Sequence, residues 1–93
     1  MTNHQIIFLS TCRFLGIAED QGAEMLLHGT FPTYHTYEAW KQAGRQVQKG
    51  QKASFSARIW KSVQQRDENG KITQRMIFKT AYFFGLDQTA PIA

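Results

Sequence analysis

Apolar side chains recur at the spacing of helix faces over the first part of the chain. A first helix is predicted from Thr2 or Asn3, either of which can act as its N-cap, through Leu15. A second, shorter helix is expected over roughly residues 18–28. Acidic residues lie in its first turn and Gly29 follows its end, an order that suits the helix dipole and a left-handed stop.

A third helix is predicted over residues 37–43. Thr36 can cap its start, and Gly44 can end it in a left-handed conformation that disfavours any side chain. We expect this helix to bury its two aromatic side chains, Tyr37 and Trp40.

Farther along, apolar and polar side chains alternate, which is the pattern of a β-strand with one buried face. The alternation is clear over residues 53–59, and a return strand is expected over about residues 72–84. The Asn69-Gly70 pair lies between them and predicts a tight hairpin turn in which both residues have positive φ.

These elements predict an α+β fold: two to three N-terminal helices packed on a small antiparallel sheet built around a long β-hairpin. A short strand near Val47 or at the C-terminus would widen the sheet, and residues 30–36 are expected to form a connector. We interpret residues 1–93 as a single domain with a helical half, 1–44, and a basic hairpin half, 45–93.

Charge is distributed unevenly along the chain. Residues 1–40 contain one basic and four acidic side chains, a net charge of −3, whereas residues 41–93 contain ten basic and three acidic ones, a net charge of +7. This concentration of basic residues favours a polyanionic partner such as nucleic acid. The alternative is an ordinary solvated surface.

The composition also argues against several classes of protein. The apolar run Ile6–Leu9 is four residues long and none is longer, far short of the about 20 residues of a membrane span. The single cysteine, Cys12, fits a reducing cytoplasm and is expected to be a buried thiol. The histidines are scattered, and no HExxH or phosphate-binding glycine motif occurs. We therefore expect no enzyme activity, no metal, no cofactor and no membrane association.

The cationic side chains of the second half form two groups, one before the hairpin and one on its strands. The first group consists of Lys41, Arg45, Lys49 and Lys52. The second group consists of Arg58, Lys61, Arg75 and Lys79. Gly50 gives the turn between Lys49 and Lys52 a backbone that can approach a phosphate, although an ordinary solvated turn explains the same residues equally well.

Binding of unpaired bases also requires aromatic faces on which the bases can stack. Trp60 shares the parity of the polar residues in its strand, so its ring is predicted to lie on the polar face. We expect a second layer to bury this ring, with an accessible stacking platform as the alternative. Tyr82 is expected to join the core with Phe84 or to serve as a second stacking ring, and Trp40 is expected in the core.

Several motifs occur in an order typical of one known family. They are Trp40-x3-Gly44-x2-Val47-x-Lys49-Gly50-Gln51-Lys52, then Ile59-Trp60, Phe83-Phe84 and Gln88-Thr89. Together they resemble the N-terminal single-stranded-DNA-binding domain of the ArdC-type antirestriction proteins, which occur on plasmids, phages and related mobile elements. The resemblance covers roughly residues 34–90, and Gln51 stands where the family usually has glutamate.

This resemblance implies an α+β domain that holds single-stranded DNA with little sequence preference. In the family such a domain commonly precedes a metalloprotease-like domain bearing HExxH, a motif that these 93 residues lack. The predicted nucleic-acid-binding residues are Lys41, Arg45, Lys49, Gly50, Lys52, Arg58, Trp60, Arg75, Lys79 and Tyr82.

Two functions compete at this point. The first is a non-catalytic module of a mobile element that binds single-stranded DNA, with RNA as the alternative ligand because stacking and phosphate contacts serve both. The second is a small antirestriction or anti-defence inhibitor that binds a host nuclease or another defence protein, for which exposed hairpin edges are suited. Either could act as a monomer or a homodimer.

Overall fold

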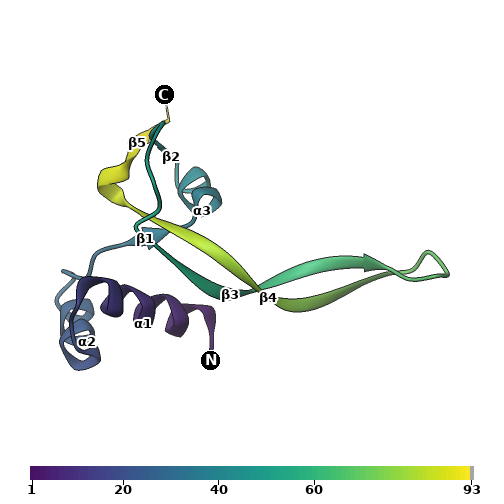
Figure 1. Cartoon of the computed structure of the whole chain (residues 1–93), viewed down its shortest axis with the longest axis horizontal. Coiled ribbons are helices and arrows are strands. Elements are labelled where there is room, and N and C mark those ends of the chain that lie inside the picture. Colours follow the sequence, from purple (N-terminus) through teal and green to yellow (C-terminus); the bar gives the residue numbers. More distant parts are fainter. Residues whose placement is uncertain (93) are drawn as a thin grey trace.

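The computed structural model describes residues 1–92 and shows the mixed α+β content that the sequence predicts. The helices are α1 (Asn3–Leu15), α2 (Glu19–Leu27), α3 (Tyr37–Gln42) and the 3-10 helix η1 (Leu86–Gln88). The strands are β1 (Tyr34–His35), β2 (Arg45–Val47), β3 (Phe55–Arg66), β4 (Ile72–Gly85) and β5 (Thr89–Pro91). The long β3–β4 hairpin dominates the molecule (Figure 1), and the predicted fold class is confirmed.

The helix ends follow from their capping residues. At the start of α1, the Thr2 side chain accepts a hydrogen bond from the Gln5 N–H (3.2 Å), and the Gln5 side chain accepts one from the Thr2 N–H (2.8 Å). At the start of α3, Thr36 Oγ1 accepts from the Ala39 N–H at 3.2 Å. Gly44 has φ +84°, so the predicted left-handed position after α3 is confirmed.

β4 is the central strand of the main sheet, whose order is β1-β4-β3. It pairs with β3 over twelve antiparallel residue pairs, from Phe55 with Phe83 to Arg66 with Ile72. At the base of the hairpin β1 adds two more antiparallel pairs. The segment that was expected to be only a connector therefore contributes a short strand.

The C-terminal residues form a second, separate sheet. β2 pairs with β5 in antiparallel register, from Arg45 with Pro91 to Val47 with Thr89. After β4 the η1 turn redirects the chain, so β5 does not run beside the β3–β4 ladder. The expectation that a strand near Val47 or the C-terminus would widen the main sheet is therefore wrong: both strands form, but they pair with each other.

The hairpin turn also differs from the prediction. Gly70 has φ +77°, but within residues 1–92 no residue other than glycine has positive φ, so the two-residue turn with Asn69 in the left-handed region is wrong. Instead Asp67 organises a longer loop, because its carboxylate accepts hydrogen bonds from the N–H groups of Asn69 (2.9 Å) and Lys71 (2.8 Å). An aspartate that bonds its own downstream backbone in this way competes with the tight turn.

The core lies where α1 covers one face of the hairpin base. The buried residues Ile59, Ala81 and Phe83 form its centre, and Ile6 and Ile7 of α1 pack against them. The remaining partly buried neighbours are Tyr34, Phe55 and Ala57. Among residues 1–92 no helix covers the opposite face of the same strands.

The two aromatic residues of α3 have different environments. Trp40 is 5% exposed, and its indole N–H donates a hydrogen bond to the Phe84 carbonyl at 2.8 Å, which confirms its place in the core. Tyr37 is 43% exposed, so its predicted burial is wrong. The helix has only six residues and packs through the Trp40 side, against His35 at a ring-centroid distance of 4.8 Å.

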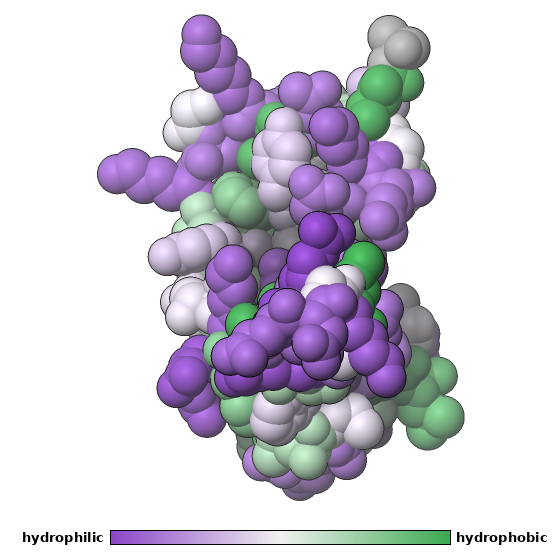
Figure 2. All heavy atoms as spheres, turned by 90° about the vertical axis from the view of Figure 1, so that its right-hand side faces the viewer, coloured by the Kyte–Doolittle hydropathy of each residue, from purple (hydrophilic) through white to green (hydrophobic). Residues whose placement is uncertain are grey.

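The molecule is more open than its length requires. Its radius of gyration is 16.0 Å, against about 12 Å for a compact chain of this length. Its accessible surface is 7009 Å², against about 5,500 Å² for a compact monomer of 10.7 kDa. The distal hairpin projects beyond the helices (Figure 1), and the view along it shows a mainly hydrophilic surface with apolar areas beside it (Figure 2).

Gly22 allows α1 and α2 to pack closely, and this contact generates a first prediction. A Cβ at position 22 would lie 2.5 Å from Cys12 Sγ and 3.1 Å from the Phe8 ring. Although alanine favours a helix by about 1 kcal/mol over glycine, we expect Gly22→Ala to lower the free energy of unfolding by about 1–3 kcal/mol through overpacking. Chemical denaturation measures this change.

The Cys12→Ala variant provides the matched background. Because it removes the sulfur that meets the new Cβ, Gly22→Ala should be less destabilising in Cys12→Ala than in the natural chain, a coupling that a double-mutant cycle isolates. A neutral or stabilising Gly22→Ala in the natural chain would contradict the close helix contact.

Candidate nucleic-acid interface

The uncovered face of the hairpin carries three aromatic rings. Side chains of directly paired residues in an antiparallel ladder lie on the same face. One such set alternates with the core residues and therefore faces away from α1. We call it the ring face, and its members are Ser56, Arg58, Trp60, Ser62, Met76, Phe78, Thr80 and Tyr82.

The rings of this face are accessible to solvent. Trp60 is 37% exposed, Phe78 41% and Tyr82 60%. Trp60 and Phe78 are paired across the strands with ring centroids 3.8 Å apart, and the Arg58 guanidinium lies 5.7 Å from the Phe78 ring centre. The expectation that a second layer buries Trp60 is wrong, and so is the expectation that Tyr82 joins the core. The reason is that α1 packs only on the face opposite the ring face. Phe84 is partly buried.

Asn3 holds the backbone of Trp60 in place. Its Oδ1 accepts from the Trp60 N–H at 2.8 Å, and its Nδ2 donates to the Trp60 carbonyl at 2.9 Å. These backbone groups therefore point away from β4, which makes Trp60–Phe78 a non-hydrogen-bonded pair, the class with the closer side chains. The same amide occupies the open edge of β3 at this point, where another strand could otherwise pair.

The alternation of the ladder also defines the free edge of β4. Since Phe78 belongs to a non-hydrogen-bonded pair, the backbone groups of Thr80 and Tyr82, two and four residues on, also point away from β3. The Phe84 carbonyl also points away from β3, as its hydrogen bond from the Trp40 indole N–H shows. β1 pairs with β4 only at Phe84 and Gly85, so the edge at Thr80 and Tyr82 carries no strand partner among residues 1–92.

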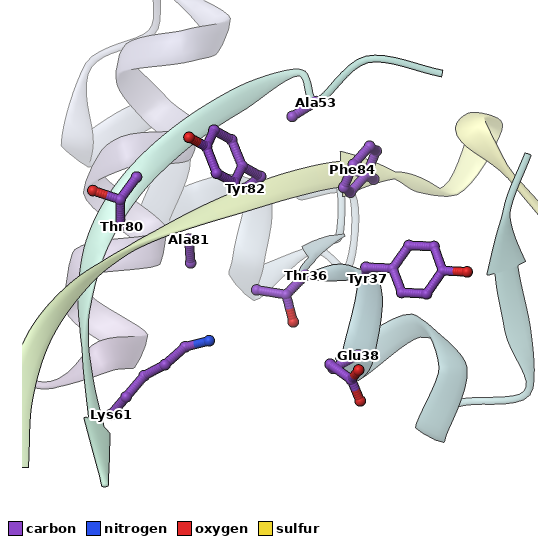
Figure 3. Close-up of a pocket in the computed structure, with 9 residues that line it drawn as sticks. All are labelled: Thr36, Tyr37, Glu38, Ala53, Lys61, Thr80, Ala81, Tyr82 and Phe84. Carbon is purple, nitrogen blue, oxygen red and sulfur yellow. The ribbon is translucent and has the colours of Figure 1, made fainter. Parts of the chain in front are cut away.

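A shallow pocket of about 450 Å³ lies between this part of the hairpin and α3. Figure 3 shows Tyr82 and Thr80 on one side, Tyr37 and Glu38 of α3 on the other, and the Lys61 ammonium reaching in from β3. Ala53, just before β3, also lines it. The pocket therefore adjoins both the ring face and the lysine-bearing loop.

Gln88 holds that loop against η1. Its Oε1 accepts hydrogen bonds from Ser54 Oγ (2.7 Å) and the Gly85 N–H (2.9 Å). Its Nε2 donates to Gln51 Oε1 (3.2 Å) and the Lys52 carbonyl (2.6 Å). All four hydrogen-bonding positions of the amide are thus used, and the loop over residues 48–52 is fixed beside the start of β3.

The predicted cations are distributed over more than one surface. Lys41, Lys49, Gly50 and Lys52 are exposed on α3 and the loop, and Arg58 is exposed on the ring face. Arg75 and Lys79 pair with Val63 and Ile59, so they belong to the face that α1 covers at its base. Arg45 is partly buried and donates to Thr89 through Nε (2.7 Å) and Nη2 (3.1 Å), a contact that links β2 to β5.

Several residues of the site were not singled out from the sequence. Phe78 has the parity of Tyr82, but only the ladder register shows that it faces Trp60. Glu38 and Tyr37 of α3 also line the site, although the sequence predicts that Tyr37 is buried. The shortness of α3 is the sequence signal for both residues, because a six-residue helix has little buried face.

The titrating groups with shifted pKa values lie away from the ring face. Burial raises the pKa of the Cys12 thiol, with a smaller contribution from the Glu19 carboxylate, and the side chain is 2% exposed as predicted. Burial raises the pKa of the Tyr34 hydroxyl, with a smaller contribution from the Asp87 carboxylate. No three His, Cys, Asp or Glu side chains within residues 1–92 gather as a metal site would require. None of the helices in that range is long and apolar enough to cross a membrane.

The role of Gln88 can be tested by its removal. Gln88→Ala leaves the Gly85 N–H and Ser54 hydroxyl without their acceptor, so we expect a loss of about 1–3 kcal/mol in unfolding free energy and faster amide exchange at Gly85. Gln21→Ala, at an exposed position of α2, is the matched control. Equal effects of the two substitutions would contradict the proposed support of the loop.

Comparison with known proteins gives one family. A model of the family described as the N-terminal domain of anti-restriction factor ArdC matches residues 22–84. A metal-free crystal structure of the antirestriction protein ArdC from plasmid R388 is 26% identical, with a TM-score of 0.41 over 64% of this chain. This chain spans 22% of that protein, and no curated protein sequence matches it. The family match covers more than half of the 93 residues, so the chain belongs to the family of ArdC N-terminal domains.

Proposed function

We propose that this chain is a non-catalytic module that binds single-stranded DNA, largely without sequence preference, through the ring face and the loop over residues 48–52. The observation that carries the proposal is the uncovered aromatic cluster with a cation beside it: Trp60 on Phe78, with Arg58 at 5.7 Å from the Phe78 ring. Contiguous exposed apolar side chains rimmed by polar ones often mark a site for a ligand or partner.

Single-stranded nucleic acid suits this surface because its bases are free to stack. Trp60 and Phe78 already contact each other, so a base can stack only on an outer face of the pair, and Tyr82 offers another ring. Tyr82 lies opposite Ser56, four residues along β3 from Trp60, a separation of about 13 Å. Arg58 lies between the two ring positions on the same face, where it can meet the intervening phosphate.

Phosphate contacts are expected from exposed cations of the loop over residues 48–52 and of α3. Lys49 and Lys52 are exposed in the loop that leads into β3. Lys41 extends the basic surface along α3. Contact with about four to six phosphates predicts a log–log salt slope of about −3 to −4. Arg45 is expected to contribute little, because its guanidinium already binds Thr89.

The family supplies the biological setting of the proposal. Its description names an anti-restriction factor, so we propose that this domain serves the antirestriction function of a mobile element from within the cytoplasm. A second candidate, binding to a host defence protein, is favoured by the free edge of β4 at Thr80 and Tyr82, which could accept an added strand. Charge reversal at Lys49 and Lys52 separates the two, because it should weaken DNA binding and leave capture of a protein partner largely intact.

The DNA-binding proposal is tested with a fluorescently labelled oligonucleotide and anisotropy. We expect Trp60→Ala to weaken binding of single-stranded DNA about five- to thirtyfold, because a stacked base contributes about 1–3 kcal/mol. Leu27→Ala, at an 81% exposed site on α2, is the control that should leave the affinity unchanged.

Two outcomes of that titration would remove the proposal. One is the absence of binding at low salt by the natural chain. The other is binding that responds neither to salt nor to Trp60→Ala, because both the phosphate and the stacking contacts would then lie elsewhere.

A further inference from the structure

We propose that the pocket between the hairpin and α3 holds one unstacked base and prefers a base with an exocyclic amino group, namely adenine, cytosine or guanine, over thymine or uracil. This inference rests on the proposed function, since a nucleic-acid strand must first lie along the ring face. It adds a base preference at one position to binding that is otherwise indifferent to sequence.

The pocket has the size and walls that a base requires. Its volume of about 450 Å³ falls within the range of small-molecule sites, about 300–1,000 Å³. Phe84 and Ala81 contribute apolar wall, while Tyr82 and Tyr37 stand on either side of the opening with 60% and 43% of their surface exposed (Figure 3). A strand that stacks on Tyr82 therefore passes the opening.

Two charged side chains of opposite kind converge on this pocket. The Glu38 carboxylate can only accept hydrogen bonds, and the Lys61 ammonium can only donate them. They come from α3 and β3 and enter from different sides (Figure 3). A ligand that satisfies both must therefore present a donor and an acceptor on one small frame.

Amino-bearing bases meet this requirement better than thymine does, because their amino donor can face a carboxylate without a carbonyl oxygen on each side of it. Adenine, cytosine and guanine each carry an amino donor together with ring-nitrogen or carbonyl acceptors. The only base donor of thymine is N3–H, and it lies between two carbonyl oxygens, which would be brought against the Glu38 carboxylate. The outward N–H and C=O groups of Thr80 and Tyr82 can bond to any base edge, so they add affinity without discrimination.

The test compares oligonucleotides of about 12 nucleotides: a thymine tract, and the same tract with every third base changed to cytosine, adenine or guanine. The decisive pair is cytosine against thymine, since both are pyrimidines and differ little in stacking. We expect the cytosine-bearing strand to bind about five- to tenfold more tightly to the natural chain. Glu38→Gln should reduce this ratio to about one without weakening binding of the thymine tract.

Glu24→Gln is the matched control, because it makes the same change in net charge at an exposed position on α2 and should leave the ratio intact. Equal affinity for all strands, or a cytosine preference that persists in Glu38→Gln, overturns this inference alone. Failure of every strand to bind overturns the proposed function, and the inference with it. The adenine and guanine strands show which amino-bearing base the pocket accepts best.

Discussion

α1 packs on a single face of the β3–β4 ladder, and the exposed features of the molecule follow from this one-sided contact. The chain buries Ile59, Ala81 and Phe83 beneath α1, but no helix or strand among residues 1–92 covers the opposite face. Side chains alternate strictly along a strand, so burial of one set exposes the other. Trp60 and Tyr82 therefore remain accessible, because α1 packs on the other face of the ladder. The molecule has far more surface than a compact chain of its mass.

Two side-chain amides fix backbone segments that lie outside the hydrophobic core. Asn3 bonds both backbone groups of Trp60, and Gln88 bonds the loop that carries Lys52. Both contacts join segments far apart in sequence, so polar contacts outside the hydrophobic core fix the backbone at Trp60 and at Lys52. Such an arrangement gives a preformed surface, which spares a ligand part of the ordering cost of binding.

The sequence predicts the helices and strands better than it predicts how they pair. Helix caps and glycine stops are local signals, and Thr36 and Gly44 act as expected. The register of the β3–β4 hairpin depends on its turn. A two-residue Asn-Gly turn would place Trp60 opposite Lys79. The loop organised by Asp67 shifts the register by one residue and places Trp60 opposite Phe78. The pocket could not be anticipated, because it needs α3 beside the hairpin, a placement fixed by the bond from the Trp40 indole to the Phe84 carbonyl.

The two tryptophans offer the most direct test of the central claim, that the uncovered hairpin face is where single-stranded DNA binds. Each gives its own indole N–H signal in an NMR spectrum, and the two environments differ: Trp40 is 5% exposed and hydrogen-bonded inside the fold, while Trp60 is 37% exposed. Titration with a single-stranded oligonucleotide should shift the Trp60 signal strongly and leave that of Trp40 nearly unchanged. A Trp60 signal that stays in place while the strand is bound would contradict the account.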